Sequence, residues 1–131
     1  MKREPLNSKE VDRFLLECID SIPHLESLLL LWKDRPNPWA PKELASRLYV
    51  DETVARKVLQ DLARAFLVTP VAGAVEQFHY VPGSEEKDIL MEAVDATYRR
   101  ELVRVTTIVH SKASSAVREF ARAFRFTKEQ D

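Results

Sequence analysis

The chain has 131 residues, 45% of them hydrophobic and 31% charged, which is the composition of a globular protein and excludes a disordered one. Its 20 lysines and arginines nearly balance its 21 aspartates and glutamates, whereas nucleic-acid binders are usually basic. The single cysteine, Cys18, excludes an internal disulfide and a cysteine-based zinc cage. The first residues lack an apolar signal region and no apolar run approaches the about 20 residues of a membrane span, so we expect a cytoplasmic protein with no membrane partner.

The first third of the chain predicts two helices and a stop. Ser8 can cap a helix that runs to about Asp20, with apolar residues on one face. Pro23 suits the first turn of a second helix, which is apolar nearly all round and should therefore lie in the core. The stretch "RPNPWAP" ends this helix, because three prolines in six positions forbid helical backbone.

The middle of the chain predicts two more helices and a β-hairpin. Pro41 can start a helix, and after a short turn Asp51 caps the next one, which runs to about Phe66. Its expected core face is Val54, Val58, Leu59 and Leu62. The stretch "LVTPVAGAVEQFHYV" then contains two short runs of β-branched and aromatic residues with a glycine between them, which predicts a hairpin.

The last third is predicted to be helical and unevenly charged. Ser84 and the carboxylates after it suit a helix start, and nothing breaks the pattern until about His110. A serine of "SKASS" can cap a last helix, "AVREFARAFRF". Residues 99–128 carry eight cations against two carboxylates, so the basic part of this protein is its tail.

The element order between residues 22 and 81 resembles a winged helix-turn-helix domain. The residues that carry the resemblance are Trp39 in the link, "ELASRLYV" and "VLQDLARAFLVT". In that family a small residue, here Ala45, lets the two helices of the motif approach closely. The resemblance implies a winged helix-turn-helix with a two-stranded β wing. Together with the N-terminal helix and the C-terminal helical extension that the residue patterns predict, this gives a mainly α fold.

The expected organisation has three parts. Residues 1–21 form the N-terminal helix, residues 22–83 form the winged domain, and residues 84–131 form a dimerisation region. Within the winged domain, the family commonly has glycine where Phe66 stands, so we expect the exit from that helix to differ from the family pattern.

The domain looks most like small bacterial transcription regulators, which place the second helix of the motif in the major groove. The resemblance implies DNA contacts from Lys42, Thr53, Arg56, Lys57 and Gln60. Arginine and lysine suit this role, because a bidentate arginine on guanine is the commonest specific contact. Two carboxylates at the start of that helix and a wing tip without cations favour the alternative, a protein-interaction module (an adaptor) that binds no DNA.

Six apolar residues form one stripe along the predicted helix 84–110. They are Met91, Val94, Tyr98, Leu102, Val105 and Val109. Their average spacing is close to the helical period, so they share one face. A helix of this length spans roughly 40 Å, more than one small domain requires, so we expect a homodimer through this stripe. The alternative is that the stripe packs on its own domain.

The last predicted helix carries a basic tail cluster, Arg118, Arg122 and Arg125, on one side. Such an amphipathic basic helix can bind nucleic acid or an acidic protein partner, and the alternative is a packing helix with a solvated basic face.

Nothing in the sequence indicates catalysis or a cofactor. Its histidines, His24, His79 and His110, are expected in three different elements and have no metal-ligand spacing. The acids, Asp61 and Glu76 among them, have no evident partner that would shift their pKa values. The sequence therefore predicts a protein that is not an enzyme and has no metal site and no cofactor.

Overall fold

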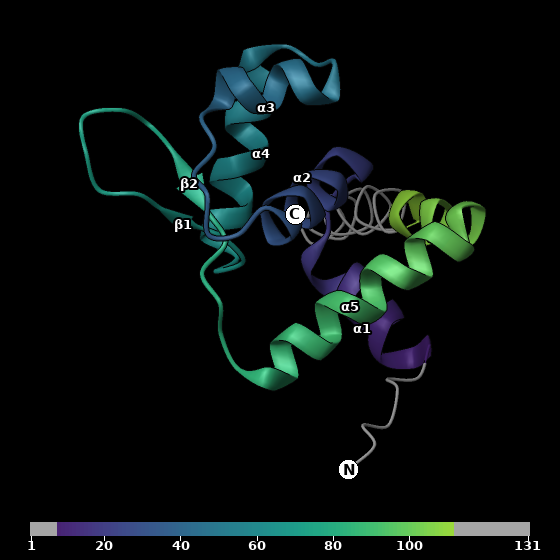
Figure 1. Ribbon diagram of the computed structural model, residues 1–131. Coiled ribbons are helices and arrows are strands. Elements are labelled where there is room, and N and C mark those ends of the chain that lie inside the picture. Colours follow the sequence, from purple (N-terminus) through teal and green to yellow (C-terminus); the bar gives the residue numbers. More distant parts are fainter. Residues whose placement is uncertain (1–7, 112–131) are drawn as a thin grey trace, which may run out of the picture.

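The computed structural model describes residues 8–111, which form a mainly helical fold with one small sheet (Figure 1). The helices are α1 (Ser8–Cys18), α2 (Ile22–Lys33), α3 (Pro41–Leu48), α4 (Glu52–Arg64) and α5 (Glu85–Arg100), and residues 102–111 are helical as well. The mainly α class is confirmed. Within residues 8–111, no helix has the length and hydrophobicity that a bilayer crossing requires. The basic tail cluster Arg118, Arg122 and Arg125 lies outside the described residues.

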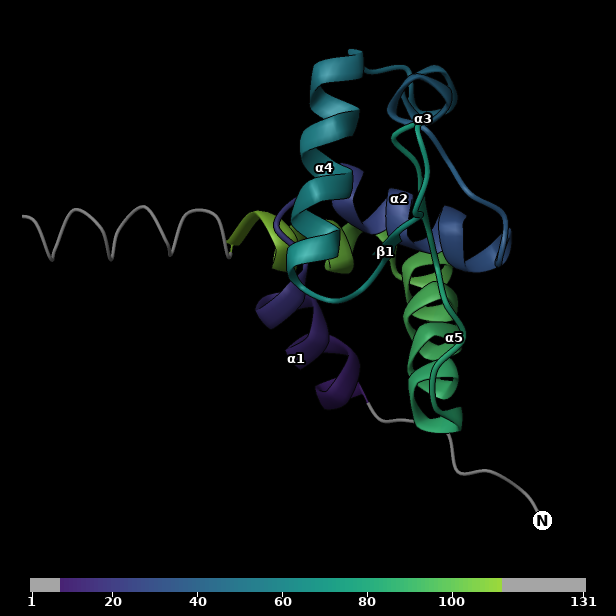
Figure 2. The same cartoon turned by 90° about the vertical axis from the view of Figure 1, so that its left-hand side faces the viewer.

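Helix α2 lies at the centre of the fold, between the α3–α4 pair on one side and α1 and α5 on the other (Figures 1 and 2). Leu25, Leu28 and Leu31 are fully buried on it. The helix starts where the sequence predicts, because the Ser21 hydroxyl accepts a hydrogen bond from the backbone N–H of His24. Its position confirms the expectation that an all-round apolar helix belongs in the core.

The core face of α4 differs by one position from the predicted one. Val58, Leu59 and Leu62 are buried as expected, but Val54 is 43% exposed and Ala55 is fully buried in its place. The buried positions 55, 58, 59 and 62 have the i, i+3, i+4, i+7 spacing of one helix face, with Val54 at its margin. Close packing of α3 on α4 agrees with the small residue Ala45, which is buried on α3.

Strands β1 (Thr69–Pro70) and β2 (Phe78–His79) form the predicted antiparallel pair, although each strand has only two residues. The link between α2 and α3 extends the ladder: the Trp39 N–H donates to the Phe78 carbonyl (2.7 Å), and the Phe78 N–H donates to the Trp39 carbonyl (2.9 Å). The pairing therefore fastens the proline-rich link to the sheet. The β1–β2 loop (residues 71–77) extends away from the helices (Figure 1).

Two aromatic residues adopt left-handed backbone conformation at helix ends. Tyr49 ends α3 with φ 57°, and Phe66 follows α4 with φ 61°. The expectation that the exit at Phe66 departs from the glycine pattern is wrong, because Phe66 itself adopts the conformation that glycine would adopt. Their side chains are 94% and 85% exposed, so burial offsets little of the roughly 1–2 kcal/mol that this conformation costs an L-residue.

The predicted single helix over residues 84–110 is instead broken. Helix α5 ends at Arg100, and Glu101 leaves helical geometry with φ −128° and ψ 50°. Its carbonyl then accepts from the Val105 N–H (2.9 Å) and starts the helical segment 102–111. Arg104 in this segment donates to both carboxylate oxygens of Asp12 on α1 (2.8 and 3.0 Å). The ion pair therefore ties the segment to α1.

The bend corrects the predicted dimer interface. Of its six residues, Met91, Val94, Val105 and Val109 are buried in the same core cluster as residues of α1 and α2. Tyr98 is half-buried and its hydroxyl donates to Glu26 of α2 (2.9 Å), and Leu102 is exposed. The stripe packs on its own chain because two short helices joined at an angle can cover a small core that one long helix cannot. The homodimer stays a prediction without an assigned surface.

Replacing Tyr49 by glycine should stabilise the protein. Glycine adopts left-handed backbone without a Cβ penalty, and the exposed ring contributes little burial. We expect Tyr49→Gly to raise the free energy of unfolding by about 0.5–1 kcal/mol in urea denaturation. Tyr49→Ala keeps the Cβ and is the matched control, so an alanine variant as stable as the glycine variant would contradict this account.

Met91 and Leu102 test whether the stripe is core or interface. Met91→Ala should cost about 2–4 kcal/mol, because it opens a cavity in the chain's own core. Leu102→Ala, a change on the same stripe at a 53% exposed side chain, should cost less than about 1 kcal/mol. Denaturation at several protein concentrations is the measurement. The stripe would be a dimer interface after all if the denaturation midpoint rose with protein concentration and both substitutions lowered the free energy of unfolding by similar amounts.

Candidate functional site on helix α4

Four of the predicted DNA contacts form one row on the outer side of α4. They are Thr53, Arg56, Lys57 and Gln60, at i, i+3, i+4 and i+7, opposite the buried face of the helix. Thr53, Lys57 and Gln60 are exposed and Arg56 is half-buried. The fifth residue, Lys42, is exposed on α3, and within residues 8–111 no hydrogen bond or ion pair joins it to the row.

Arg56 is held by two carboxylates. Its Nε donates to Glu76 in the β1–β2 loop, and its Nη2 donates to Glu52 one turn earlier on α4, both at 2.9 Å. Hydrogen bonds to Glu76 and then to Glu52 raise the pKa of Arg56. The expectation that the acids have no partner that shifts their pKa values is wrong for Asp61, which is described below, and Glu76 has a partner in Arg56. Glu52 could have been recognised as a partner from its i, i+4 spacing, but Glu76 is 20 residues away.

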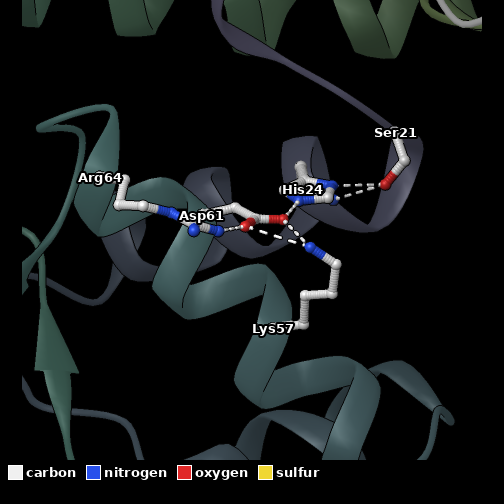
Figure 3. A network of polar contacts seen from close by, with 5 residues as sticks. All are labelled: Ser21, His24, Lys57, Asp61 and Arg64. Atoms are coloured by element: carbon white, nitrogen blue, oxygen red, sulfur yellow. Dashed lines mark hydrogen bonds and ion pairs between the residues drawn. The ribbon is translucent and has the colours of Figure 1, made fainter.

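Lys57, the other cation of the row, donates to Asp61, which also accepts from Arg64 (Figure 3). The Lys57 ammonium lies 3.3 and 3.4 Å from the two carboxylate oxygens. Asp61 itself is mostly buried, whereas both cations are exposed. Two cations of α4 therefore share one carboxylate of the same helix, and this group of three side chains has a net charge of +1.

His24 connects this group to α2. Its Nε2 lies 2.9 Å from Asp61 Oδ2, and its Nδ1 lies 2.6 Å from the Ser21 hydroxyl oxygen (Figure 3). Burial alone would raise the pKa of Asp61, but hydrogen bonds from His24, Arg64 and Lys57 outweigh it and lower that pKa. An ionised carboxylate only accepts hydrogen bonds, so the His24 Nε2 carries the proton.

The residues Ser21, His24 and Asp61 are those of a serine-hydrolase triad, but their arrangement differs. In that triad Nε2 faces the serine and Nδ1 faces the aspartate, whereas His24 is turned the other way. The Ser21 hydroxyl also caps α2. We assign the group a structural role, which is to fasten the first turn of α2 to the last turn of α4. Sequence reasoning missed it, because His24 and Asp61 are 37 residues apart.

Asp20, His24 and Asp61 are also the residues that could hold a metal ion. Their ligand atoms lie within 4.8 Å of one another, and imidazole with two carboxylates is a donor set that suits zinc. However, the Asp61 carboxylate is already bound by Lys57 and Arg64, so a metal ion would have to compete with two cations. We therefore assign no metal to this group.

A groove of about 240 Å³ runs beside the row on α4. It is lined on the α4 side by Thr53, Val54, Lys57 and Val58, and on the α2 side by Ser21, Pro23 and His24. Its walls are thus largely apolar, and the exposed Val54 lies at this groove.

The segment from α3 to β2 has no net charge. Between residues 41 and 79, the cations are Lys42, Arg47, Arg56, Lys57 and Arg64, and the carboxylates are Glu43, Asp51, Glu52, Asp61 and Glu76. Five of each sign give a net charge of zero with histidine neutral. Attraction to a polyanion therefore depends on local rearrangement of ion pairs and not on the overall field.

Comparisons with known proteins do not assign a family. No protein-family model, no curated protein and no solved structure matches the chain. The function is therefore inferred from the surface of α4 and its surroundings.

Asp61→Asn should show how much the group around His24 stabilises the fold. We expect a loss of about 1–2 kcal/mol near neutral pH, because hydrogen bonds to a charged acceptor are removed. The pKa of Asp61 is lower in the folded chain than in the unfolded one, where aspartate titrates at about 3.9. Its contribution is therefore present above that value and lost as the pH falls through the folded pKa.

The gap between wild type and Asp61→Asn should accordingly shrink as the pH falls from about 5 to about 3, measured by urea denaturation. Asp51→Asn is the control on the same helix, because asparagine caps a helix as well as aspartate and the Asp51 side chain makes no capping hydrogen bond. A gap that stays constant with pH would contradict the assigned role of the Asp61 charge.

Proposed function

We propose that residues 22–81 act as a winged helix-turn-helix DNA-binding unit and that the protein regulates transcription. The observation that carries the proposal is the row Thr53, Arg56, Lys57 and Gln60 on the exposed side of α4, the helix that would enter the major groove. Support comes from the packing of α3 on α4 and from the β1–β2 loop, which would be the wing. Such a regulator would work in the cytoplasm, and as a homodimer it would present two α4 helices to a two-fold operator.

The ion pairs of the row determine what kind of DNA binding to expect. Exposed ion pairs are worth about 0–1 kcal/mol each, so Arg56 and Lys57 can exchange their carboxylates for DNA at little cost. The carboxylates of Glu52 and Glu76 then remain beside the major groove of the bound DNA and repel its phosphates. We therefore expect weak non-specific binding that is detectable only at low salt, with specificity coming from base contacts.

Fluorescence anisotropy of a labelled random-sequence duplex tests the proposal. Binding should appear at low salt and weaken steeply as salt rises, because phosphate contacts release counterions. Arg56→Ala combined with Lys57→Ala should reduce the affinity by about tenfold or more. Lys87→Ala combined with Arg100→Ala is the control, because it removes the same charge from the exposed surface of α5. It should lower the affinity for DNA less than the Arg56–Lys57 double variant does.

A second variant tests the mechanism in the opposite direction. Glu76→Gln removes the negative charge that pairs with Arg56. The same charge would otherwise lie beside the DNA that the α4 row is expected to contact. It should raise the affinity for DNA several-fold at low salt. Equal affinity in wild type, Glu76→Gln and the Arg56–Lys57 double variant would overturn the proposal that this row contacts DNA.

The second candidate function is a protein-interaction module. Two observations favour it: the net charge of zero between residues 41 and 79, and the largely apolar groove in which Val54 is exposed beside Thr53. Apolar pockets with a rim of mixed charge are typical of protein interfaces. If neither wild type nor Glu76→Gln binds the duplex at the lowest salt at which the protein is soluble, the adaptor replaces the DNA-binding proposal.

A further inference from the structure

A cavity of about 380 Å³ lies where α2, α3 and α5 meet, away from the row on α4. Its apolar wall is formed by Leu29 and Leu30 of α2 and Leu48 of α3. Lys33, Arg47 and Arg99 add a positive charge from each of the three helices. The volume falls in the range of sites that bind small molecules.

Two of the three cations share one carboxylate. Asp95 of α5 has a side chain that is 9% exposed, and it accepts from Lys33 (2.9 Å) and from Arg99 (3.1 Å). Glu26, the other carboxylate of the lining, accepts from the Tyr98 hydroxyl (2.9 Å), and burial together with this contact raises the pKa of Tyr98 to about 12. The lining thus carries three positive and two negative charges, a net charge of +1.

Arg47 is the cation of this cavity that has no carboxylate. Within residues 8–111 its side chain makes no hydrogen bond or ion pair, whereas Lys33 and Arg99 both make one. A guanidinium presents paired N–H donors that match a carboxylate in a bidentate contact. The cavity therefore combines an unshared carboxylate-binding group with an apolar wall.

We propose that this cavity binds a small organic carboxylate with an apolar or aromatic body. The carboxylate would lie on Arg47, and the body would pack on Leu29, Leu30 and Leu48. Such a ligand would contact α3 and α5 together, so it would link the helix that packs against α4 to the C-terminal part of the chain. The binding site does not depend on the proposed DNA-binding function, because it uses none of the residues of the α4 row.

Benzoate and octanoate are suitable probes, and benzamide is the neutral counterpart of benzoate. In ¹⁵N-labelled protein, either carboxylate at millimolar concentration should shift backbone amide signals along α2, α3 and α5 around the lining residues. Benzamide should bind at least about tenfold more weakly than benzoate, because its neutral amide has one acceptor oxygen and can form neither an ion pair nor a bidentate contact with the Arg47 guanidinium.

Arg47→Gln should weaken the binding of benzoate about tenfold, while Lys42→Gln, which removes the same charge from the same helix outside the cavity, should leave it unchanged. The ¹⁵N spectra also show whether each variant is folded. The proposal is overturned if neither carboxylate binds at up to about 20 mM, which lies far above typical affinities for preformed sites. Equal binding of benzoate and benzamide, equal losses in the two variants, or shifts confined to another surface would overturn it as well.

Discussion

The burial of most of helix α2 is the constraint on which the rest of the structure depends. Its apolar surface needs cover on every side, and α3 with α4 supply it on one side while α1 and α5 supply it on the other (Figures 1 and 2). A polar contact fastens each end. At the first turn His24 binds Asp61 of α4, and at the last turn Lys33 binds Asp95 of α5, each at 2.9 Å. The surface on α4 and the cavity beside α5 are thus positioned by the same helix.

The two cations of the α4 row are not equivalent in this framework. Lys57 shares Asp61 with His24 and Arg64, so its departure toward a ligand leaves that carboxylate with two partners. Arg56 is different, because its contact with Glu76 is a hydrogen-bonded link between α4 and the β1–β2 loop. A ligand that takes Arg56 breaks this link. Binding through Arg56 is therefore coupled to the position of the loop, and binding through Lys57 is not.

Local patterns in the sequence predicted the elements well, and the candidate site only in part. Periodicity and capping residues predicted α2, α3, α4 and the β-hairpin, because these signals act over a few residues. The contacts of Arg56 with Glu76 and of His24 with Asp61 span 20 and 37 residues, so they depend on tertiary packing that no local pattern reports. Glu101 ends α5 without a proline or glycine, and its departure from helical geometry has no local signal either.

The apolar stripe shows what periodicity can and cannot decide. Spacing indicated correctly that Met91, Val94, Val105 and Val109 need cover, since all four are buried, but it cannot say whether the cover comes from a second chain or from the same one. A straight helix over residues 84–110 would be too long for this core, but the bend at Glu101 turns residues 102–111 toward α1, where Arg104 binds Asp12, so the stripe needs no second chain. Asp95 holds α5 on α2, and Arg104 holds the segment 102–111 on α1. The C-terminal part of the described chain therefore shares one core with α2. A ligand between α3 and α5 would act on that core directly.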